Sequence, residues 1–266
     1  MLSLINFLKT IFEQRYLIMS LAKRQIKTQF VGSLLGFVWT FINPLALILI
    51  FWFVFSVGLK TRPLGDIPFA VWFTAGLAIW ISFSEIVTGS VNVIIENQVL
   101  IKKTAIKAHV LQIAKIVAAT IPHLIFLVIL IILILLFKLP FRLYYIQALY
   151  YFFCMCMLSI GLGWLLSAIN VFIRDTALVV NMVMQFLFWL TPIVWDVNIM
   201  PKRYEFFLKL NPVFYLVQGY RESFFYFVPF WGHWKMTIYY WVLTGVIFVV
   251  GATVFRKTRP HFADVL

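Results

Sequence analysis

Side chains that could do chemistry are few in this chain and lie far apart. The four histidines, His109, His123, His233 and His261, do not form the His-Glu-x-x-His pair that holds a catalytic zinc ion. The sequence contains neither a Gly-x-x-x-x-Gly-Lys-[Ser/Thr] nucleotide loop nor a Gly-x-Ser-x-Gly nucleophile motif. We therefore predict that this chain has no catalytic residue, binds no metal and carries no cofactor of its own.

Carboxylates are the remaining candidates, and the sequence scatters them too. A membrane-embedded glycosyltransferase or acyltransferase would need Asp, Glu or His clustered at one membrane face, and the nine acidic residues are spread along the chain. Only Glu85 and His123 are ionisable residues within apolar runs. A carrier coupled to protons or sodium ions usually needs more such groups, paired across helices. A secondary carrier remains an alternative, with Glu85 as its coupling site.

Basic residues, in contrast, form a clear pattern near the start of the chain. Ser20, Lys23, Arg24 and Lys27 recur at helical spacing, so the three cations share one side of a helix. The small-residue segment 32–36 follows, and an apolar run comes directly after it. This order predicts an amphipathic helix on a membrane surface that turns through a hinge into a span. We expect the glycines of the hinge to let the helix lie close to its neighbours.

Composition supports a membrane protein. The chain is 64% hydrophobic and 12% charged, whereas soluble domains have about 25% charged residues. The net charge of +13 would suggest nucleic acid in a soluble protein, but here the cations flank apolar runs, so we expect contact with membrane lipids and none with nucleic acid. Since a span needs about 20 apolar residues, we predict an all-α membrane protein with six transmembrane helices. Their ranges are 35–58, 68–91, 116–137, 145–169, 177–194 and 237–255.

Orientation follows from the basic residues. Six spans place both termini on one side, and that side holds thirteen Lys and Arg residues against four in the short loops opposite. The count omits the long segment 195–235, where the rule is weak. Because cytoplasmic loops are enriched in Lys and Arg, we predict that both termini are cytoplasmic.

Segment 195–235 has an unusual pattern. Its two apolar stretches, 210–220 and 223–234, are each about half a span, and runs of this length are more often re-entrant or interfacial than spanning. We predict two short helices that re-enter the outer leaflet before the last span. The alternative is an ordinary extracytoplasmic loop, but its many aromatic residues would be poorly placed in water.

The missing chemistry favours transport driven by a separate ATPase, and two cytoplasmic segments could bind it. The first is 92–107, which contains Glu96, Asn97, Lys102 and Lys103; the second is the short link 170–175, which ends in Arg174 and Asp175. Simple anchoring at the positive inner face is the alternative for the lysines. For Asp175 the alternative is a helix cap at the start of the fifth span.

At this point the residues resemble a known family. The Gly-Ser-x-x-Gly-x-x-Trp-x-x-x-x-Pro order from Gly32 to Pro44 is similar to the N-terminal signature of ABC-2 type permeases that export polysaccharides. The tail Pro260-His261-Phe262-Ala263-Asp264 resembles those of O-antigen and capsule exporters. Further matches in the same order lie between these two ends; they are Asn97-x-x-Leu-Ile-Lys-Lys103, Arg174-Asp175, Thr191-Pro192-Ile193, Pro201, Asn211-Pro212 and Tyr220-Arg221.

The resemblance implies an assembly. It implies a homodimer in the bacterial cytoplasmic (inner) membrane with two copies of a nucleotide-binding ATPase, which would bind ATP and magnesium. It also implies that a lipid-linked polysaccharide passes between the two permease copies. The interfacial helix and the cytoplasmic loops would then contact the ATPases. The residues expected there are Lys23, Arg24, Lys27, Glu96, Asn97, Lys102, Lys103, Arg174 and Asp175.

Aromatic side chains suggest how such a polymer would be handled, because sugars pack their C–H faces on rings. The residues expected along the substrate pathway are Trp39, Phe41, Trp72, Phe73, Tyr220 and Arg221. The alternative for each aromatic residue is an interfacial belt or a lipid-facing position. Glu85 stands outside the family pattern, and its role stays open.

The sequence thus predicts a permease subunit, without enzyme activity of its own, of an ATP-driven exporter of O-antigen or capsular polysaccharide. A teichoic acid exporter, an exporter of drugs or small lipids, a secondary carrier and a membrane-embedded glycosyltransferase are the alternatives. We expect one domain over 1–266. Its parts are an interfacial helix (1–32), spans one to five (33–194), the re-entrant segment (195–235), span six (236–255) and a cytoplasmic tail (256–266).

Overall fold

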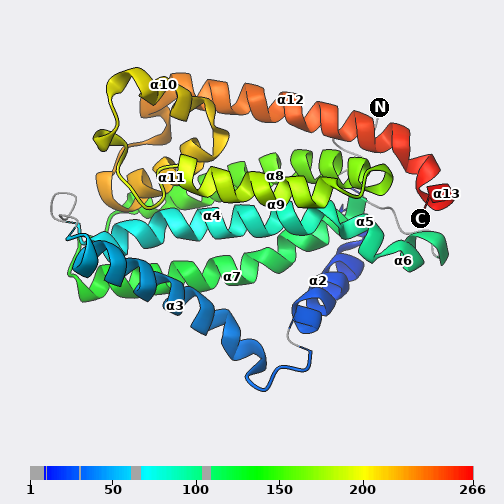
Figure 1. Ribbon diagram of the computed structural model, residues 1–266, viewed down its shortest axis with the longest axis horizontal. Helices are drawn as coiled ribbons and strands as arrows, with labels where there is room; N and C mark the ends of the chain where they lie inside the picture. Colours follow the sequence, from blue (N-terminus) through cyan, green and yellow to red (C-terminus); the bar gives the residue numbers. More distant parts are fainter. Residues whose placement is uncertain (1–8, 10, 30, 61–66, 104–108, 266) are drawn as a thin grey trace.

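The computed structural model describes residues 9, 11–29, 31–60, 67–103 and 109–265, and this part of the chain is built from helices, as predicted (Figure 1). The other positions of the expected interfacial segment 1–32 lie outside the described residues. The longer helices are α2 (Arg15–Gln29), α3 (Trp39–Trp52), α4 (Phe69–Val91), α7 (His109–Leu136), α8 (Gln147–Phe172), α9 (Thr176–Leu190), α10 (Lys202–Leu210), α11 (Pro212–Arg221) and α12 (Trp234–Thr258). The short ones are η1 (Gly36–Val38), η2 (Phe53–Gly58), α5 (Val93–Glu96), α6 (Gln98–Lys103), η3 (Leu143–Ile146), η4 (Val197–Ile199), η5 (Glu222–Tyr226), η6 (Phe230–His233), η7 (Arg259–His261) and α13 (Phe262–Val265).

Five helical segments of the described chain are long and apolar enough to cross a membrane. They are Gly36–Gly58, Phe69–Val91, Val110–Leu136, Leu143–Phe172 and Phe230–His261. The predicted span 177–194 corresponds to α9, which is apolar but has only 15 residues. It ends early because Thr191 precedes Pro192 and takes an extended conformation, which a residue before proline favours. At about 1.5 Å per residue α9 is about 22 Å long, shorter than the hydrocarbon core.

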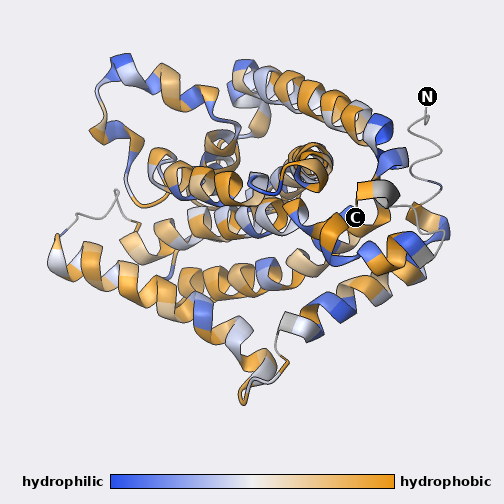
Figure 2. Ribbon diagram, turned by 45° about the vertical axis from the view of Figure 1, so that its right-hand side comes forward, coloured by the Kyte–Doolittle hydropathy of each residue, from blue (hydrophilic) through white to orange (hydrophobic). Residues whose placement is uncertain are grey.

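Helix α4 is the centre of the bundle. It packs against α7, α8, α9 and α11, and 83% of its most apolar 18-residue stretch is buried. Helix α12 lies along α8. Helix α3 belongs to the most exposed span, Gly36–Gly58, of which only 11% of the most apolar 18-residue stretch is buried. Hydrophobic residues run along most of the long helices, including their outer faces (Figure 2). Lipid or another protein chain must cover those faces, because apolar surface of this extent is unfavourable in water.

The short helices gather at the two ends of the bundle. Helices α5, α6 and α13 lie at one end, together with α2, which packs on α7; α10 and α11 lie at the opposite end (Figure 1). Asn170 near the end of α8 donates to Val91 O at 3.1 Å and to Asn92 Oδ1 at 3.0 Å. These bonds join the α8–α9 link to the α4–α5 junction, so the two loops predicted to bind an ATPase share one end.

The predicted hinge between α2 and α3 is confirmed, but its glycines have a different role. Gly32 and Gly36 adopt φ values of +80° and +49°, which glycine adopts without the strain that a side chain imposes. A side chain at either position would meet no atom within 4 Å. The expectation that they allow close packing is therefore wrong: they are needed for the backbone turn.

Segment 195–235 folds only in part as predicted. The first apolar stretch forms α11, which is buried against α4 and α8. The second stretch, 223–234, does not form one helix, because Phe227 adopts a left-handed conformation with φ 52° and Pro229 follows. It consists of η5, an extended turn and η6. Gln147 of α8 secures this turn, since it donates to Val228 O at 2.9 Å and accepts from Phe230 N at 2.8 Å.

Helices α8 and α12 approach each other most closely at two glycines. A Cβ atom on Gly161 would lie 2.9 Å from the backbone of Phe248, and one on Gly251 would overlap the carbonyl oxygen of Gly161. Small residues at such crossings let helix backbones pack in direct contact, which stabilises helix pairs in membranes.

We predict that Gly251→Ala destabilises the chain by about 1–3 kcal/mol, because the added methyl group must push the two helices apart. Thermal unfolding of the purified chain in detergent measures this. Gly245→Ala is the matched control on the same helix, since its Cβ atom would meet nothing within 4 Å. Equal unfolding temperatures for the two variants would contradict the crossing.

Candidate functional site

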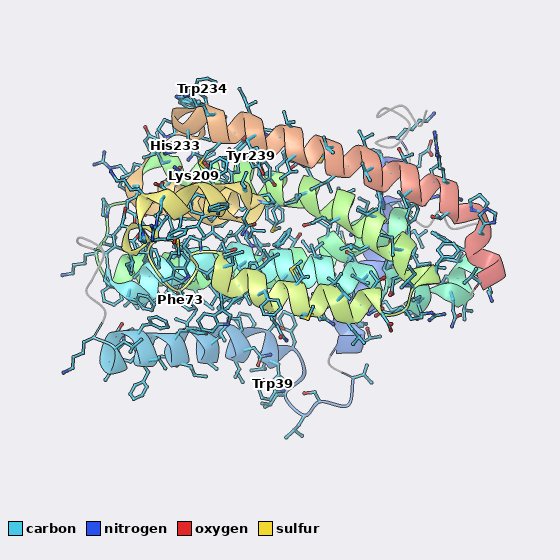
Figure 3. All side chains as sticks on the ribbon, turned by 45° about the horizontal axis from the view of Figure 1, so that its top comes forward. Trp39, Phe73, Lys209, His233, Trp234 and Tyr239 are labelled. Atoms are coloured by element: carbon cyan, nitrogen blue, oxygen red, sulfur yellow. The ribbon has the colours of Figure 1, made fainter. Side chains whose placement is uncertain are left out.

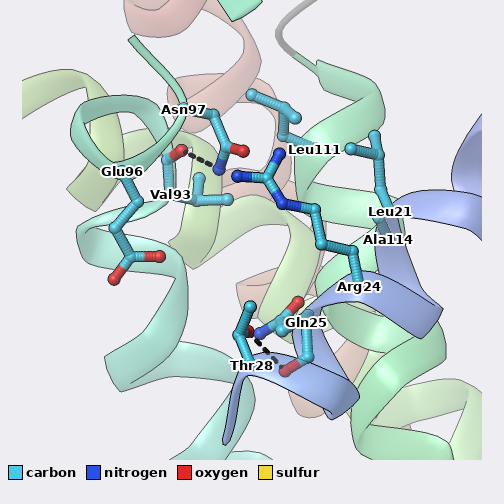
Figure 4. Close-up of a pocket in the computed structure, with 9 residues that line it drawn as sticks. All are labelled: Leu21, Arg24, Gln25, Thr28, Val93, Glu96, Asn97, Leu111 and Ala114. Carbon is cyan, nitrogen blue, oxygen red and sulfur yellow. Dashed lines mark hydrogen bonds between the residues drawn. The ribbon is translucent and has the colours of Figure 1, made fainter. Parts of the chain in front are cut away.

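Three of the residues predicted to bind an ATPase surround one pocket. Arg24 of α2, Glu96 at the end of α5 and Asn97 beside it line a cavity of about 150 Å³, together with Leu21, Gln25, Thr28, Val93, Leu111 and Ala114 (Figure 4). The Asn97 side chain donates to Val93 O at 2.9 Å, which fixes its position. The pocket thus carries a cation, a carboxylate and an amide at the end of the bundle where the short helices gather.

Packing explains why the cations of α2 are free to bind. Ile18 and Ala22 are buried where α2 packs on α7, and Lys23, Arg24 and Lys27 are exposed on the rest of the helix. The predicted cationic face is confirmed as a surface feature. Its exposure leaves the guanidinium and ammonium groups available to lipid headgroups or to a protein partner.

The remaining docking candidates lie in the two loops at the same end. Lys102 is exposed, and Lys103 is the last residue of α6. Arg174 and Asp175 are exposed in the α8–α9 link. Asp175 occupies the N-cap position of α9, as the alternative role predicts, but its side chain makes no capping bond. Thr176 Oγ1 instead donates to Ile173 O at 2.7 Å, so Asp175 is free to face a partner.

Arg221, predicted on the substrate pathway, is instead deep in the bundle. Its guanidinium carbon lies 3.3 Å from the ring centroid of Trp72, and its two terminal nitrogens donate to Pro192 O at 2.6 Å and Ile193 O at 2.7 Å. Gly76 of α4 makes room for it, since a Cβ there would lie 2.9 Å from Nη2. Arg221 and Trp72 are each 1% exposed. The pair therefore fixes the turn after α9 against α4 and α11.

Tyr220, the residue before Arg221 on α11, belongs to a second buried network. Its hydroxyl lies 2.8 Å from His123 Nε2, and His123 Nδ1 lies 2.9 Å from Ser82 Oγ. The network joins α11, α7 and α4 through polar groups that are all buried. Because unpaired polar groups are costly in an apolar interior, these bonds specify how the three helices meet.

The other aromatic candidates lie in separate places. Phe73 is buried between α4 and α3, 4.9 Å from the ring of Phe51, whereas Trp39 lies at the opposite end of α3 (Figure 3). Phe41 is exposed on α3, with its ring 5.7 Å from that of Phe37. The structure thus brings Trp72 together with Arg221 and leaves Trp39 and Phe41 at the surface. The pathway role of all six residues stays a prediction.

Comparison with known proteins identifies the architecture. The profile of the ABC-2 type transporter family matches residues 16–225. This chain belongs to the ABC-2 type transporter family. The match extends from α2 to η5, so it includes the pocket of Arg24, Glu96 and Asn97, the buried networks and all but the last of the five spans.

Individual ABC-2 relatives match along most of their length. The O-antigen export system permease protein RfbA of Klebsiella pneumoniae is 23% identical over 253 residues, which cover 94% of this chain and 95% of the relative. RfbA of Myxococcus xanthus is 26% identical over 241 residues, which cover 84% of this chain and 85% of the relative. The polysialic acid transport protein KpsM of Escherichia coli is 25% identical over 211 residues, which cover 79% of this chain and 81% of the relative.

Several polar residues of this ABC-2 chain escape sequence analysis. Ser82, Gln112, Asn170 and Asn211 are ordinary residues in apolar runs or loops, yet each joins two helices or a helix and a turn. Asn211, for example, donates to Thr191 Oγ1 at 2.7 Å and caps α11 through Val213 N at 3.0 Å. His123 is identified by the sequence as an ionisable residue in an apolar run, but its partners Tyr220 and Ser82 are not.

We predict that Tyr220→Phe destabilises the chain by about 1–3 kcal/mol, because it leaves the buried His123 Nε2 without its partner. Denaturation of the purified chain in detergent measures the loss. Tyr144→Phe is the control, since this tyrosine is 38% exposed. If both variants unfold at the wild-type denaturant concentration, Tyr220 does not bond to His123.

Proposed function

We propose that this chain is the membrane permease subunit of an ATP-driven exporter that moves a lipid-linked polysaccharide of O-antigen or capsular type across the bacterial inner membrane. The observation that carries the proposal is the near full-length match to O-antigen export permeases, which covers 94% of this chain. KpsM, named for polysialic acid transport, supports the same substrate class. The scattered carboxylates favour transport over catalysis by this chain.

The proposed topology has six spans within one domain over residues 1–266. It consists of the five long spans and α9, with the turn 191–194 completing the sixth crossing. Helix α11 is proposed to re-enter the outer leaflet, which accounts for its buried apolar surface. Both termini are cytoplasmic in this topology, because α2, α5, α6 and α13 then share the side that is rich in Lys and Arg.

A partner ATPase would bind at that cytoplasmic end. The pocket of Arg24, Glu96 and Asn97 would accept a side chain of the partner, while Lys23, Lys27, Lys102, Lys103, Arg174 and Asp175 would surround it. Arginine and glutamate together favour a partner with complementary charges of both signs. ATP and magnesium would be bound by the ATPase, so this chain would need no cofactor.

We further propose a homodimer with one ATPase per permease copy. The outer faces of α3 and α9 are apolar and exposed, with Leu45, Leu49, Phe186 and Trp189 among their residues. A second copy would cover part of this surface, and the polymer would pass between the copies. Phe41 lies on the same face of α3 as Leu45 and Leu49, and Trp39 is partly exposed at the start of the helix. Trp72, Phe73, Tyr220 and Arg221 would shape the pathway from behind α3.

The test is co-purification of the tagged chain with the ATPase that it uses. We predict that the wild-type chain retains the ATPase and that Arg24→Glu weakens the complex at least tenfold, because a like charge then faces Glu96 and the partner. Arg15→Glu, an exposed arginine on the same helix that does not line the pocket, is the control. Absence of any ATPase from the wild-type preparation would contradict the proposed function.

A further inference from the structure

A cavity of about 400 Å³ lies between α3, α4 and α7, on the cytoplasmic side of the proposed topology. Its walls are mainly apolar, but Thr40 and Asn43 of α3 and Glu85 of α4 also line it, and Trp39 is part of the same lining. A smaller adjoining pocket is lined by Thr40 and Glu85 again and extends to Gln25 of α2. Ligand pockets in proteins are usually of about 300–1,000 Å³, so this space is of the right size for a small ring.

The polar side chains of this cavity form no hydrogen bond within the described part of the chain. The Glu85 carboxylate forms no hydrogen bond or ion pair there; Lys115 attracts it from a distance, but the Lys115 side chain lies over Gly89, one helical turn away. Thr40 Oγ1 is buried and unbonded, and the Asn43 amide, which is exposed, makes no hydrogen bond to a described residue either. Such groups are costly in an apolar environment, so their convergence indicates a ligand.

The kind of ligand follows from charge and from hydrogen-bonding capacity. Glu85 is the one charged residue among those that line the cavity, which disfavours phosphate and other anions. A hard metal cation would want six or more oxygen ligands, and the described residues gather no group of three acidic, His or Cys side chains here. A carboxylate that accepts, and a hydroxyl and an amide that both donate and accept, instead match the hydroxyl groups of a neutral sugar.

We propose that this cavity binds a neutral sugar unit of the exported polymer. Glu85 accepts hydrogen bonds from sugar hydroxyls, Thr40 and Asn43 bond the neighbouring ones, and the indole of Trp39 packs on the C–H face of the ring. Glu85 is six residues before the end of α4, about 9 Å along the helix axis, so the sugar binds near the end that carries the docking pocket. The inference rests on the proposed function, since it assigns a binding site for the same polymer.

The first test measures ATP hydrolysis by the reconstituted chain and its ATPase at increasing concentrations of lipid-linked glycan. We expect Glu85→Ala to raise the half-saturating concentration tenfold or more, and the nearly isosteric Thr40→Val to raise it threefold to tenfold, because each removes a hydrogen bond to the sugar. Hydrolysis without glycan is measured for each variant and subtracted. Thr88→Val is the matched control: its hydroxyl donates to Ser84 O at 2.8 Å, and it does not line the cavity.

A second test measures how far the glycan protects a thiol in the cavity from reaction, instead of the affinity for the glycan. We expect the lipid-linked glycan to slow the reaction of the Asn43→Cys thiol with a maleimide at least fivefold, and to leave the Val246→Cys thiol on the exposed face of α12 unaffected. The wild-type chain, with Cys154 and Cys156, gives the background. Equal protection by the lipid carrier without its sugar would overturn the inference in favour of a lipid site.

The outcomes separate this inference from the proposed function. If glycan stimulates the wild-type complex and the Thr40 and Glu85 variants respond at the same concentration, the cavity does not bind sugar and the export function stands. If the wild-type complex does not respond to glycan at any concentration, the proposed function fails, and the inference fails with it.

Discussion

The fold depends on one constraint: a polar group buried in the apolar interior of the bundle must find its partner within the protein. Arg221 meets it with the Trp72 ring and the carbonyl oxygens of Pro192 and Ile193, and it thereby fixes the turn where α9 ends. Tyr220 and His123 meet it together and join α11 to α7. These bonds explain how α11, which is short and partly polar, can be buried against α4.

The same constraint identifies the region where polar side chains form no hydrogen bond within the described chain. Glu85, Thr40 and Asn43 form no hydrogen bond to a described residue, and α3 has little of its surface covered. Both features lie between α3 and the rest of the bundle, next to the hinge of Gly32 and Gly36. A subunit that moves a polymer needs a surface that is satisfied only when substrate or a second copy is present, and this region meets that requirement.

Much of the fold could be predicted from the sequence, because span length and hydropathy are local properties. The five long spans and the cationic face of α2 are examples, and spacing alone indicates Lys23, Arg24 and Lys27. Hydropathy could not predict where α9 ends or that 223–234 is not one helix. The breaks occur at Pro192, Phe227 and Pro229, which lie within apolar runs and do not change their hydropathy. Burial of Arg221 was also beyond the sequence, because the carbonyl oxygens of Pro192 and Ile193 that receive it lie 29 and 28 residues earlier in the chain.

The most direct test of the account is transport by inside-out vesicles that contain this chain and its ATPase. We predict that lipid-linked polysaccharide on the outer surface becomes protected from an added glycosidase only when the chain, the ATPase and ATP are all present. A hydrolysis-deficient ATPase would abolish that protection. Protection that needs neither ATP nor the ATPase, or none under any condition, would contradict the claim that this chain is the permease of an ATP-driven polysaccharide exporter.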